Sequence, residues 1–173
     1  MVEYDTAFME RREAFVLGLF RWRRTLYSDG EIELSLSPGG FLESGDGIRD
    51  GYTFDICLPG ERKPVGYISL RLRESPQLYY LGHIGYRIHA QHRGHGYAGR
   101  ALKLLIPLMR SEGLLHPVIT TDVSNTASRK TCLRAGCLLE RIAPVPAEYR
   151  EICSGSLYKC RYILCIPPER ERD

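Results

Sequence analysis

The sequence predicts an α/β protein, and three stretches carry this prediction. Residues 52–58 and 65–72 are rich in aromatic and β-branched side chains and flank a turn with Pro and Gly, which indicates an antiparallel hairpin. Residues 79–112 read as a strand, a glycine turn and a helix. Residues 118–135 read as a buried strand followed by another helix.

Composition sets the broad class of the protein. The chain has 173 residues, enough for a single domain over 1–173 with a substantial core. Its formal charge of +3 is too small to indicate a nucleic-acid partner. No apolar run approaches the ~18 residues of a membrane span, and the N-terminus lacks the apolar core of a signal peptide. Six cysteines without metal-finger spacing favour a cytoplasmic protein with reduced thiols.

The first 51 residues show a weaker pattern than the core that follows. Residues 5–27 predict an amphipathic helix, because Asp5 can cap it and apolar side chains recur on one face. Residues 31–37 alternate apolar and polar side chains, which predicts a strand. Residues 38–51 contain five glycines and are expected to form a mobile loop.

From residue 52 to 166 the pattern predicts the core of the domain. After the hairpin we expect a third strand over 79–89 and, beyond the central turn, a helix over 97–112. A strand over 118–123, a helix over 125–135 and two last strands over 137–142 and 158–166 follow. Residues 167–173 form a charged tail that we expect to be disordered.

The central turn is the most informative stretch of the sequence. Two glycines, Gly94 and Gly96, stand one residue apart between the third strand and the helix that begins near Tyr97. Such a strand–glycine–helix turn leaves backbone N–H groups unpaired at the positive end of the helix dipole. Glycine also lets a ligand come close to the backbone. The turn therefore predicts a phosphate or diphosphate site.

Two motifs resemble those of one protein family. Residues 91–96 (QHRGHG) fit the Gln/Arg-x-x-Gly-x-Gly/Ala diphosphate loop of the GNAT family, the Gcn5-related N-acetyltransferases that bind acetyl-CoA. Asn125-x-x-Ser128, with Gly136 at the end of its helix, looks like the family's Asn-x-x-Ser helix. The resemblance covers residues 52–166, and the segment 84–88 (IGYRI) is similar to the ribosomal-protein N-terminal acetyltransferase branch.

The resemblance implies a fold and a cofactor site. The expected fold is the GNAT fold, a mixed, mostly antiparallel sheet that splays around acetyl-CoA and carries helices on both faces. Residues 1–51 depart from the family order, since at most residues 2–4 precede the first helix. By analogy, the pantetheine arm of the cofactor pairs with the backbone of Ile88, His89 and Ala90. The diphosphate binds the turn formed by Arg93, Gly94, His95, Gly96, Tyr97 and Ala98. The side chains of Asn125 and Ser128 also contact the cofactor.

The same residues allow other interpretations. Residues 94–99 (GHGYAG) also match the Gly-x-Gly-x-x-Gly dinucleotide fingerprint of nucleotide-dependent oxidoreductases, with Asp122 downstream. In that fingerprint the glycines follow the strand directly, whereas five residues separate Ile88 from Gly94 here. His89, His92 and His95 recur every third residue, but no carboxylate or cysteine completes a metal-ligand set, so we expect no metal. Asn125 can serve as a helix N-cap as well as a cofactor ligand.

The reaction implied by the resemblance is attack of a neutral amine on an acetyl thioester. Deprotonating a lysine-like amine at pH 7 costs about 4–5 kcal/mol, whereas an α-amine costs only about 1 kcal/mol. His83 stands where many relatives carry a glutamate base, although a buried structural histidine is an equal alternative. Cys132 stands where many relatives carry a tyrosine acid, although a thiol there also suits a small core position. Tyr86, Tyr97 and Tyr162 are possible substitutes for that acid, without support from their positions.

The leading interpretation is therefore an acetyl-CoA-dependent N-acetyltransferase that acts on a primary amine. The acceptor is a small molecule or a protein N-terminus, and the sequence leaves a homodimer open. A non-catalytic acyl-CoA-binding module is the alternative, because both proton-transfer positions depart from the common family residues.

Overall fold

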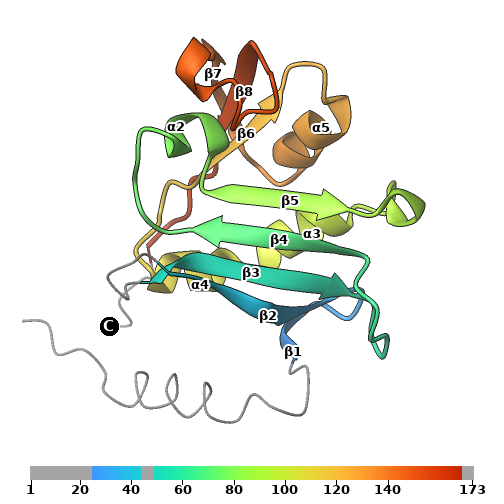
Figure 1. Cartoon of the computed structure of the whole chain (residues 1–173). Helices are drawn as coiled ribbons and strands as arrows, with labels where there is room; N and C mark the ends of the chain where they lie inside the picture. Colours follow the sequence, from blue (N-terminus) through green and yellow to red (C-terminus); the bar gives the residue numbers. More distant parts are fainter. Residues whose placement is uncertain (1–24, 44–48, 169–173) are drawn as a thin grey trace, which may run out of the picture.

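The computed structural model describes residues 25–43 and 49–168, and in this part of the chain eight strands form one sheet (Figure 1). The strand order is β1-β2-β3-β4-β5-β6-β8-β7, and every neighbouring pair is antiparallel except β5 and β6. The strands are β1 (Thr25–Ser28), β2 (Glu33–Glu43), β3 (Arg49–Cys57), β4 (Gly66–Arg71), β5 (Ile84–Ile88), β6 (Val118–Asp122), β7 (Leu138–Pro144) and β8 (Tyr158–Ile163).

Short helices connect these strands. They are α2 (Leu78–Leu81), α3 (Tyr97–Leu104), α4 (Ile106–Ser111) and α5 (Thr126–Arg134), with single 3₁₀ turns η1 (Ala90–His92) and η2 (Ala147–Tyr149). In Figure 1, α3 and α4 lie behind the sheet formed by β2 to β5. None of the helices in the described ranges is long and apolar enough to cross a membrane.

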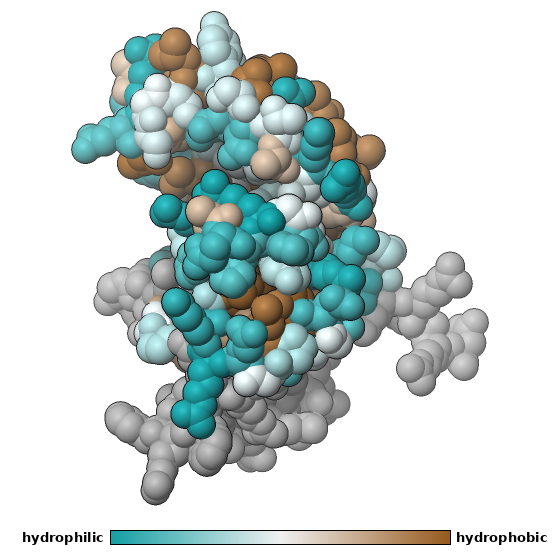
Figure 2. Space-filling model, turned by 90° about the vertical axis from the view of Figure 1, so that its right-hand side faces the viewer, coloured by the Kyte–Doolittle hydropathy of each residue, from teal (hydrophilic) through white to brown (hydrophobic). Residues whose placement is uncertain are grey.

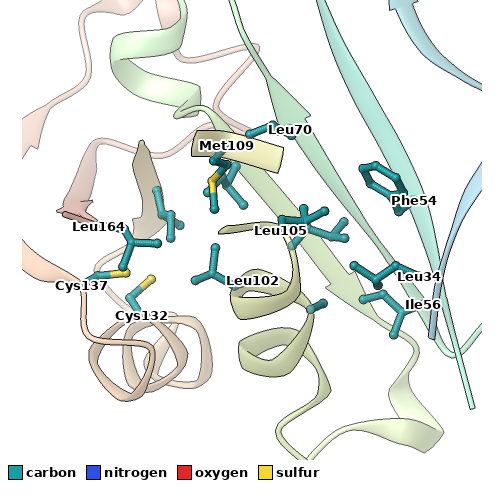
Figure 3. Close-up of a cluster of buried hydrophobic side chains, with 14 of the residues drawn as sticks. Leu34, Phe54, Ile56, Leu70, Leu102, Leu105, Met109, Cys132, Cys137 and Leu164 are labelled. Atoms are coloured by element: carbon teal, nitrogen blue, oxygen red, sulfur yellow. The ribbon is translucent and has the colours of Figure 1, made fainter. Parts of the chain in front are cut away.

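The main core lies between the sheet and α3–α4. Alternate residues of β2, β3 and β4 point toward these helices, as the period-two pattern requires. Figure 3 shows Leu102, Leu105 and Met109 between the sheet residues Phe54 and Leu70 on one side and Cys132, Cys137 and Leu164 on the other. The three helix residues are fully buried, so α3 and α4 are fixed against both halves of the sheet.

The sheet opens between β5 and β6. The only register pair between these parallel strands is Ile84 with Ile119, at the start of β5. Beyond that point β6 leaves β5, and α3 and α5 begin at the open end (Figure 1). The mixed, mostly antiparallel sheet predicted from the family resemblance, with its central splay, is confirmed.

Two elements near the centre differ from the prediction. The strand expected over 79–89 begins only at Ile84, because residues 78–81 form α2; the Leu78 N–H donates to the Ser75 hydroxyl at its start, and Gly82 ends it with φ +73°. The helix expected over 97–112 is two helices that meet at Leu105. Pro107 in the first turn of α4 explains the break, since proline lacks an N–H and its ring collides with the preceding turn.

The loop expected over 38–51 is mostly strand. β2 continues to Glu43 across a register shift after Leu36, and β3 already begins at Arg49. A Cβ on Gly40 would run into the Thr53 carbonyl, and a Cβ on Gly51 into the Leu70 carbonyl. These glycines therefore serve close strand approach rather than mobility.

The N-terminal helix prediction is wrong at its end, because residues 25–28 form β1. The rest of that helix, residues 5–24, lies outside the described residues, as do positions 169–173 of the expected tail.

Candidate functional site

The central glycine turn joins the end of β5 to α3 as predicted. Gly94 has φ +90° and Gly96 has φ +77°, in the left-handed region that glycine adopts without strain. A Cβ on either residue would meet no atom of the described residues within 4 Å. The space beside both glycines is therefore open, and a ligand can reach the backbone there.

The backbone N–H groups of the turn are available to a ligand. Those of Gly94, His95, Gly96, Tyr97 and Ala98 find no acceptor within the described residues. They stand at the N-terminal end of α3, where the helix dipole is positive. Unpaired N–H groups at this end favour an anion such as a diphosphate.

A pocket of about 310 Å³ lies over this turn. Its wall includes the guanidinium-bearing residues Arg87 and Arg93, and no carboxylate residue of the described chain lines it. Figure 2 looks onto this end of the molecule, where the surface is mainly hydrophilic, while hydrophobic side chains gather toward the part that carries α5, β7 and β8. The full lining is Tyr86, Arg87, Ile88, His92, Arg93, Gly94, Gly96, Tyr97, Ala98, Asn125, Ala127, Ser128 and Thr131.

The backbone of β5 also faces the pocket. The Arg71 N–H donates to the His83 carbonyl (2.7 Å), and the His89 N–H donates to the Val65 carbonyl (2.9 Å). Because antiparallel pairing alternates, odd-numbered residues of this segment bond to β4 and even-numbered ones face β6. Tyr86 and Ile88 lie beyond the single β5–β6 pair, so their backbone groups face the opening. An extended ligand can pair with them like an added strand.

Only one of the three residues predicted to pair with the pantetheine arm has backbone groups that face the opening. Ile88 faces the opening, whereas the His89 N–H is already bonded to Val65 and Ala90 begins η1. The Arg93 Nε donates to the Ile88 carbonyl (3.1 Å), which fixes the arginine beside the turn. Arg93 is thus both a brace for the turn and a positive charge on the pocket wall.

Asn125 caps α5 across the pocket from the glycine turn. Its Oδ1 accepts the Ser128 N–H (3.0 Å), which satisfies one of the free donors at the helix start. Both residues line the pocket, and Oδ1 is committed to the cap. The NH₂ group of Asn125 has no partner among the described residues, so it can still donate to a ligand.

Tyr86 connects β5 to α5 at the other end of the pocket. Its hydroxyl lies 2.9 Å from the Ser128 Oγ, 3.3 Å from the Ser128 carbonyl oxygen and 3.8 Å from the Cys132 Sγ. Burial and the nearby Cys132 thiol raise the pKa of Tyr86 above its ordinary value. The phenol therefore keeps its proton over the whole neutral range.

Cys132 lies beneath Tyr86 rather than on the pocket wall. Its side chain is fully buried and belongs to the core cluster. A hydrogen bond from the Cys137 thiol lowers the pKa of Cys132, and the same bond raises that of Cys137. All six cysteines are free thiols, and this pair packs the space between α5 and β7.

His83 is buried at the closed end of the β5–β6 junction. The Val118 N–H donates to its Nδ1 (3.1 Å), so the ring proton resides on Nε2, which donates to the Glu74 Oε1 (2.8 Å). Both nitrogens are thus engaged, and His83 is absent from the pocket wall. This arrangement leaves no nitrogen lone pair for a substrate amine and instead holds β5, β6 and the Glu74 segment together.

The sequence named Tyr86 only as one of three possible substitutes for the general acid, and it gave no role to Glu74. Alternation along the strand puts Tyr86 on the same face as Ile84 and Ile88, and the structure shows that it lines the pocket. Glu74 lies in a loop, and nothing in its local pattern indicated the contact with His83. Among the described residues, no cluster of His, Cys, Asp and Glu is arranged to hold a metal ion.

Comparisons with known proteins bear on the family and the fold. The sequence model of the acetyltransferase (GNAT) domain matches residues 7–138. No curated protein matches the chain. The chain is similar in structure to the ribosomal-protein-S5-alanine acetyltransferase of Vibrio fischeri, with 14% identity, a TM-score of 0.62, and 84% of this chain and 98% of that chain covered.

Two further solved structures have related folds. RimL, a ribosomal L7/L12 α-N-protein acetyltransferase, gives 22% identity and a TM-score of 0.53, covering 69% of this chain and 72% of that chain. The microcin C7 self-immunity acetyltransferase MccE, solved with acetyl-CoA and AMP, gives 24% identity and a TM-score of 0.52, covering 68% of this chain but only 62% of that chain. Since the domain match spans most of the sequence, the chain belongs to the GNAT family of acetyl-CoA-dependent acetyltransferases.

Proposed function

We propose that this protein transfers an acetyl group from acetyl-CoA to a primary amine by direct attack, without an acetylated enzyme intermediate. The main support for this proposal is that one pocket contains both a group of free backbone N–H donors and a pair of hydroxyl groups. Free N–H groups and Arg93 stand at one end, and the Tyr86–Ser128 hydroxyl pair stands at the other. The first end suits a diphosphate, and the second suits a leaving thiolate.

The opening between β5 and β6 connects these ends. A strand rises about 3.3 Å per residue, so the path along β5 from Ile88 back to Ile84 is about 13 Å. An extended arm that starts at the glycine turn and pairs with Ile88 and Tyr86 thus ends near the strand junction. Acetyl-CoA supplies a thioester there, and the residues of this chain hold that end beside the Tyr86 hydroxyl.

We assign Tyr86 the task of donating a hydrogen bond to the sulfur that leaves. Its raised pKa keeps the O–H intact, and Ser128 orients it through the 2.9 Å contact. A phenol with such a pKa stabilises a thiolate as a hydrogen-bond donor more readily than by complete proton transfer. Cys132, buried beneath the phenol, supports Tyr86 by packing.

The acceptor amine must lose its proton without help from His83, whose nitrogens are both engaged. An α-amine requires only about 1 kcal/mol for this at pH 7, so water suffices. We therefore propose an amine of low pKa, such as an α-amine, as the preferred acceptor. RimL, whose fold this chain shares, is an α-N-protein acetyltransferase, which agrees with this choice.

Release of free thiol from acetyl-CoA in the presence of an amine panel tests the proposal. The panel pairs each α-amine with a lysine-type amine of similar size. We expect steady thiol release at pH 7, faster with α-amines. Tight binding of acetyl-CoA by calorimetry, without thiol release above background for any amine, would instead identify a non-catalytic acyl-CoA-binding module.

A further inference from the structure

Arg71 places a guanidinium on the face of the sheet opposite the core. The neighbouring Leu70 is fully buried against α3–α4, so alternation puts the Arg71 side chain on the other face. The same face of β5 carries His83, Gly85 and Arg87, which pair with Arg71, Ser69 and Tyr67 across the ladder. This face contributes no apolar side chain to the core at these positions.

The Arg71 guanidinium has no carboxylate partner within residues 25–43 and 49–168. One of its five N–H groups donates to the Gly82 carbonyl (3.1 Å), and it forms no other hydrogen bond or ion pair within the described residues. The side chain is partly buried, and this burial lowers the pKa of Arg71. A desolvated cation without a carboxylate costs free energy, which a bound anion would recover.

Its position is next to the strand junction. Gly82, which it contacts, forms a bridge with Ile119 where β5 and β6 meet. Both terminal nitrogens of Arg71 lie 3.6 Å from where a Cβ on Gly85 would be. Gly85 precedes Tyr86, so the guanidinium lies across β5 from the end of the pocket that holds the Tyr86 hydroxyl. Because Gly85 has no side chain, the Arg71 guanidinium can lie against the backbone of β5 at this position.

We propose that Arg71 binds a carboxylate of the acceptor, so that the substrates are primary amines that also carry a carboxylate. The inference rests on the proposed transferase function and adds a substrate class to it. With the donor filling the pocket on the α3–α5 side, the acceptor reaches the thioester from the Arg71 face. A guanidinium offers two parallel N–H groups to a carboxylate, which orients the substrate as well as binding it.

The test compares peptide acceptors that share an N-terminal alanine, so that their amines have similar pKa values and differ in a nearby carboxylate. At saturating acetyl-CoA, thiol release is measured with C-terminally amidated tetrapeptides that begin Ala-Glu or Ala-Gln, and with alanyl-alanine and its C-terminal amide. The tetrapeptide pair reports a carboxylate on a neighbouring side chain, and the dipeptide pair reports a backbone carboxylate. In one of the two pairs, we expect the acceptor that carries the carboxylate to have a kcat/KM roughly 10- to 100-fold higher than its uncharged partner, mainly because its KM is lower.

The variants locate the effect at Arg71. Arg71→Gln should abolish the preference, and Arg71→Lys should retain part of it, because the charge remains while the paired N–H geometry is lost. Arg73→Gln is the matched control, since Arg73 already has an ion pair with Asp50 (2.7 Å), and it should keep the preference. Acetyl-CoA affinity by calorimetry should be the same in all three.

Equal use of both members of each pair by the wild-type protein would overturn the Arg71 proposal alone, and so would a preference that survives in Arg71→Gln. The wild-type comparison and Arg71→Lys keep the test decisive if Arg71→Gln does not fold. Absence of thiol release with every amine, despite acetyl-CoA binding, would overturn the transferase function and this site with it.

Discussion

The Tyr86 hydroxyl and the Ser128 Oγ lie 2.9 Å apart and join β5 to α5 across the opening of the sheet. The two side chains come from sequence positions 42 residues apart and meet on the wall of the same pocket. The family resemblance implies a tyrosine acid at position 132 on α5, where this chain has Cys132. We propose that Tyr86, which comes from β5 and contacts α5, supplies the hydroxyl instead.

Replacing Tyr86 by Phe should lower kcat by roughly 10- to 100-fold, because one hydrogen bond to a developing thiolate is lost. Acetyl-CoA affinity, measured by calorimetry, should change little, since the diphosphate end is untouched. Tyr158→Phe, an exposed tyrosine on β8, is the control and should match the wild type. A Tyr86→Phe protein with full kcat would exclude the assigned role.

The pH profile gives an independent check on Tyr86. Because its pKa is raised, the phenol stays protonated well above its ordinary pKa of 10.0. Activity should therefore rise as the acceptor amine deprotonates and show no falling limb from Tyr86 up to about pH 10. A falling limb near pH 9 that disappears in Tyr86→Phe would contradict this protonation state.

Gly96→Ala should weaken acetyl-CoA binding by roughly tenfold or more, because a Cβ would project into the space over the turn and move its N–H groups. Gly60→Ala is a matched control: both glycines have φ +77°, and a Cβ on either would meet no atom within 4 Å. The backbone strain, about 1–2 kcal/mol, should thus be similar in both. Equal acetyl-CoA affinity in the two variants would disprove the role of the turn.

Two substitutions at Asn125 separate its cap from its contact with the donor. Asn125→Asp keeps the oxygen that accepts the Ser128 N–H, so its melting temperature should stay near that of the wild type. It also puts a negative charge in the pocket and should weaken acetyl-CoA binding strongly. Asn125→Ala should cost about 0.5–2 kcal/mol of stability through the lost cap. If Asn125→Asp binds acetyl-CoA normally, the side chain only caps α5.

The ion pair of Asp122 and Lys159 (2.6 Å) predicts a pH-dependent stability. Burial raises the pKa of Asp122, but hydrogen bonds from Lys159 and Ser156 outweigh it, so the net pKa is lowered. A carboxyl with a depressed folded-state pKa stabilises the protein above its unfolded pKa of about 3.8, and this contribution is lost as pH falls through the folded pKa.

Asp122→Asn should therefore melt at a lower temperature than the wild type at pH 7, and the difference should shrink below pH 3.8. Glu151→Gln, at an exposed side chain, serves as the control and should show a constant small difference. Thermal melts followed by circular dichroism between pH 7 and pH 3 measure both. A difference for Asp122→Asn that persists unchanged at low pH would contradict the assignment.

Local patterns predicted much of the fold. The hairpin of β3 and β4, the helix start at Tyr97 and α5 with its Asn125 cap follow from alternation, glycine placement and capping, which act over a few residues. The glycine turn was also found from sequence, because its backbone geometry depends on Gly94 and Gly96 themselves.

Long-range contacts account for the failures. The glycines of residues 38–51 predicted a loop, yet Gly40 and Gly51 let neighbouring strands approach, which depends on partners distant in sequence. The sequence left His83 open between a base and a buried structural histidine. Its contacts with a backbone N–H of β6 and with a glutamate of another loop are not visible in its own segment. Tyr86 reaches the opening because β5 has no pair with β6 beyond Ile84. Arg71 gains its position from the pairing of β4 with the His83 segment, which is also distant in sequence.

A crystal structure of the protein with bound CoA would locate the diphosphate and the thiol together. We expect the diphosphate oxygens within about 3.2 Å of backbone nitrogens between Gly94 and Ala98, and the sulfur close to the Tyr86 hydroxyl. A diphosphate held elsewhere, or an arm that does not pass between β5 and β6, would contradict this expectation.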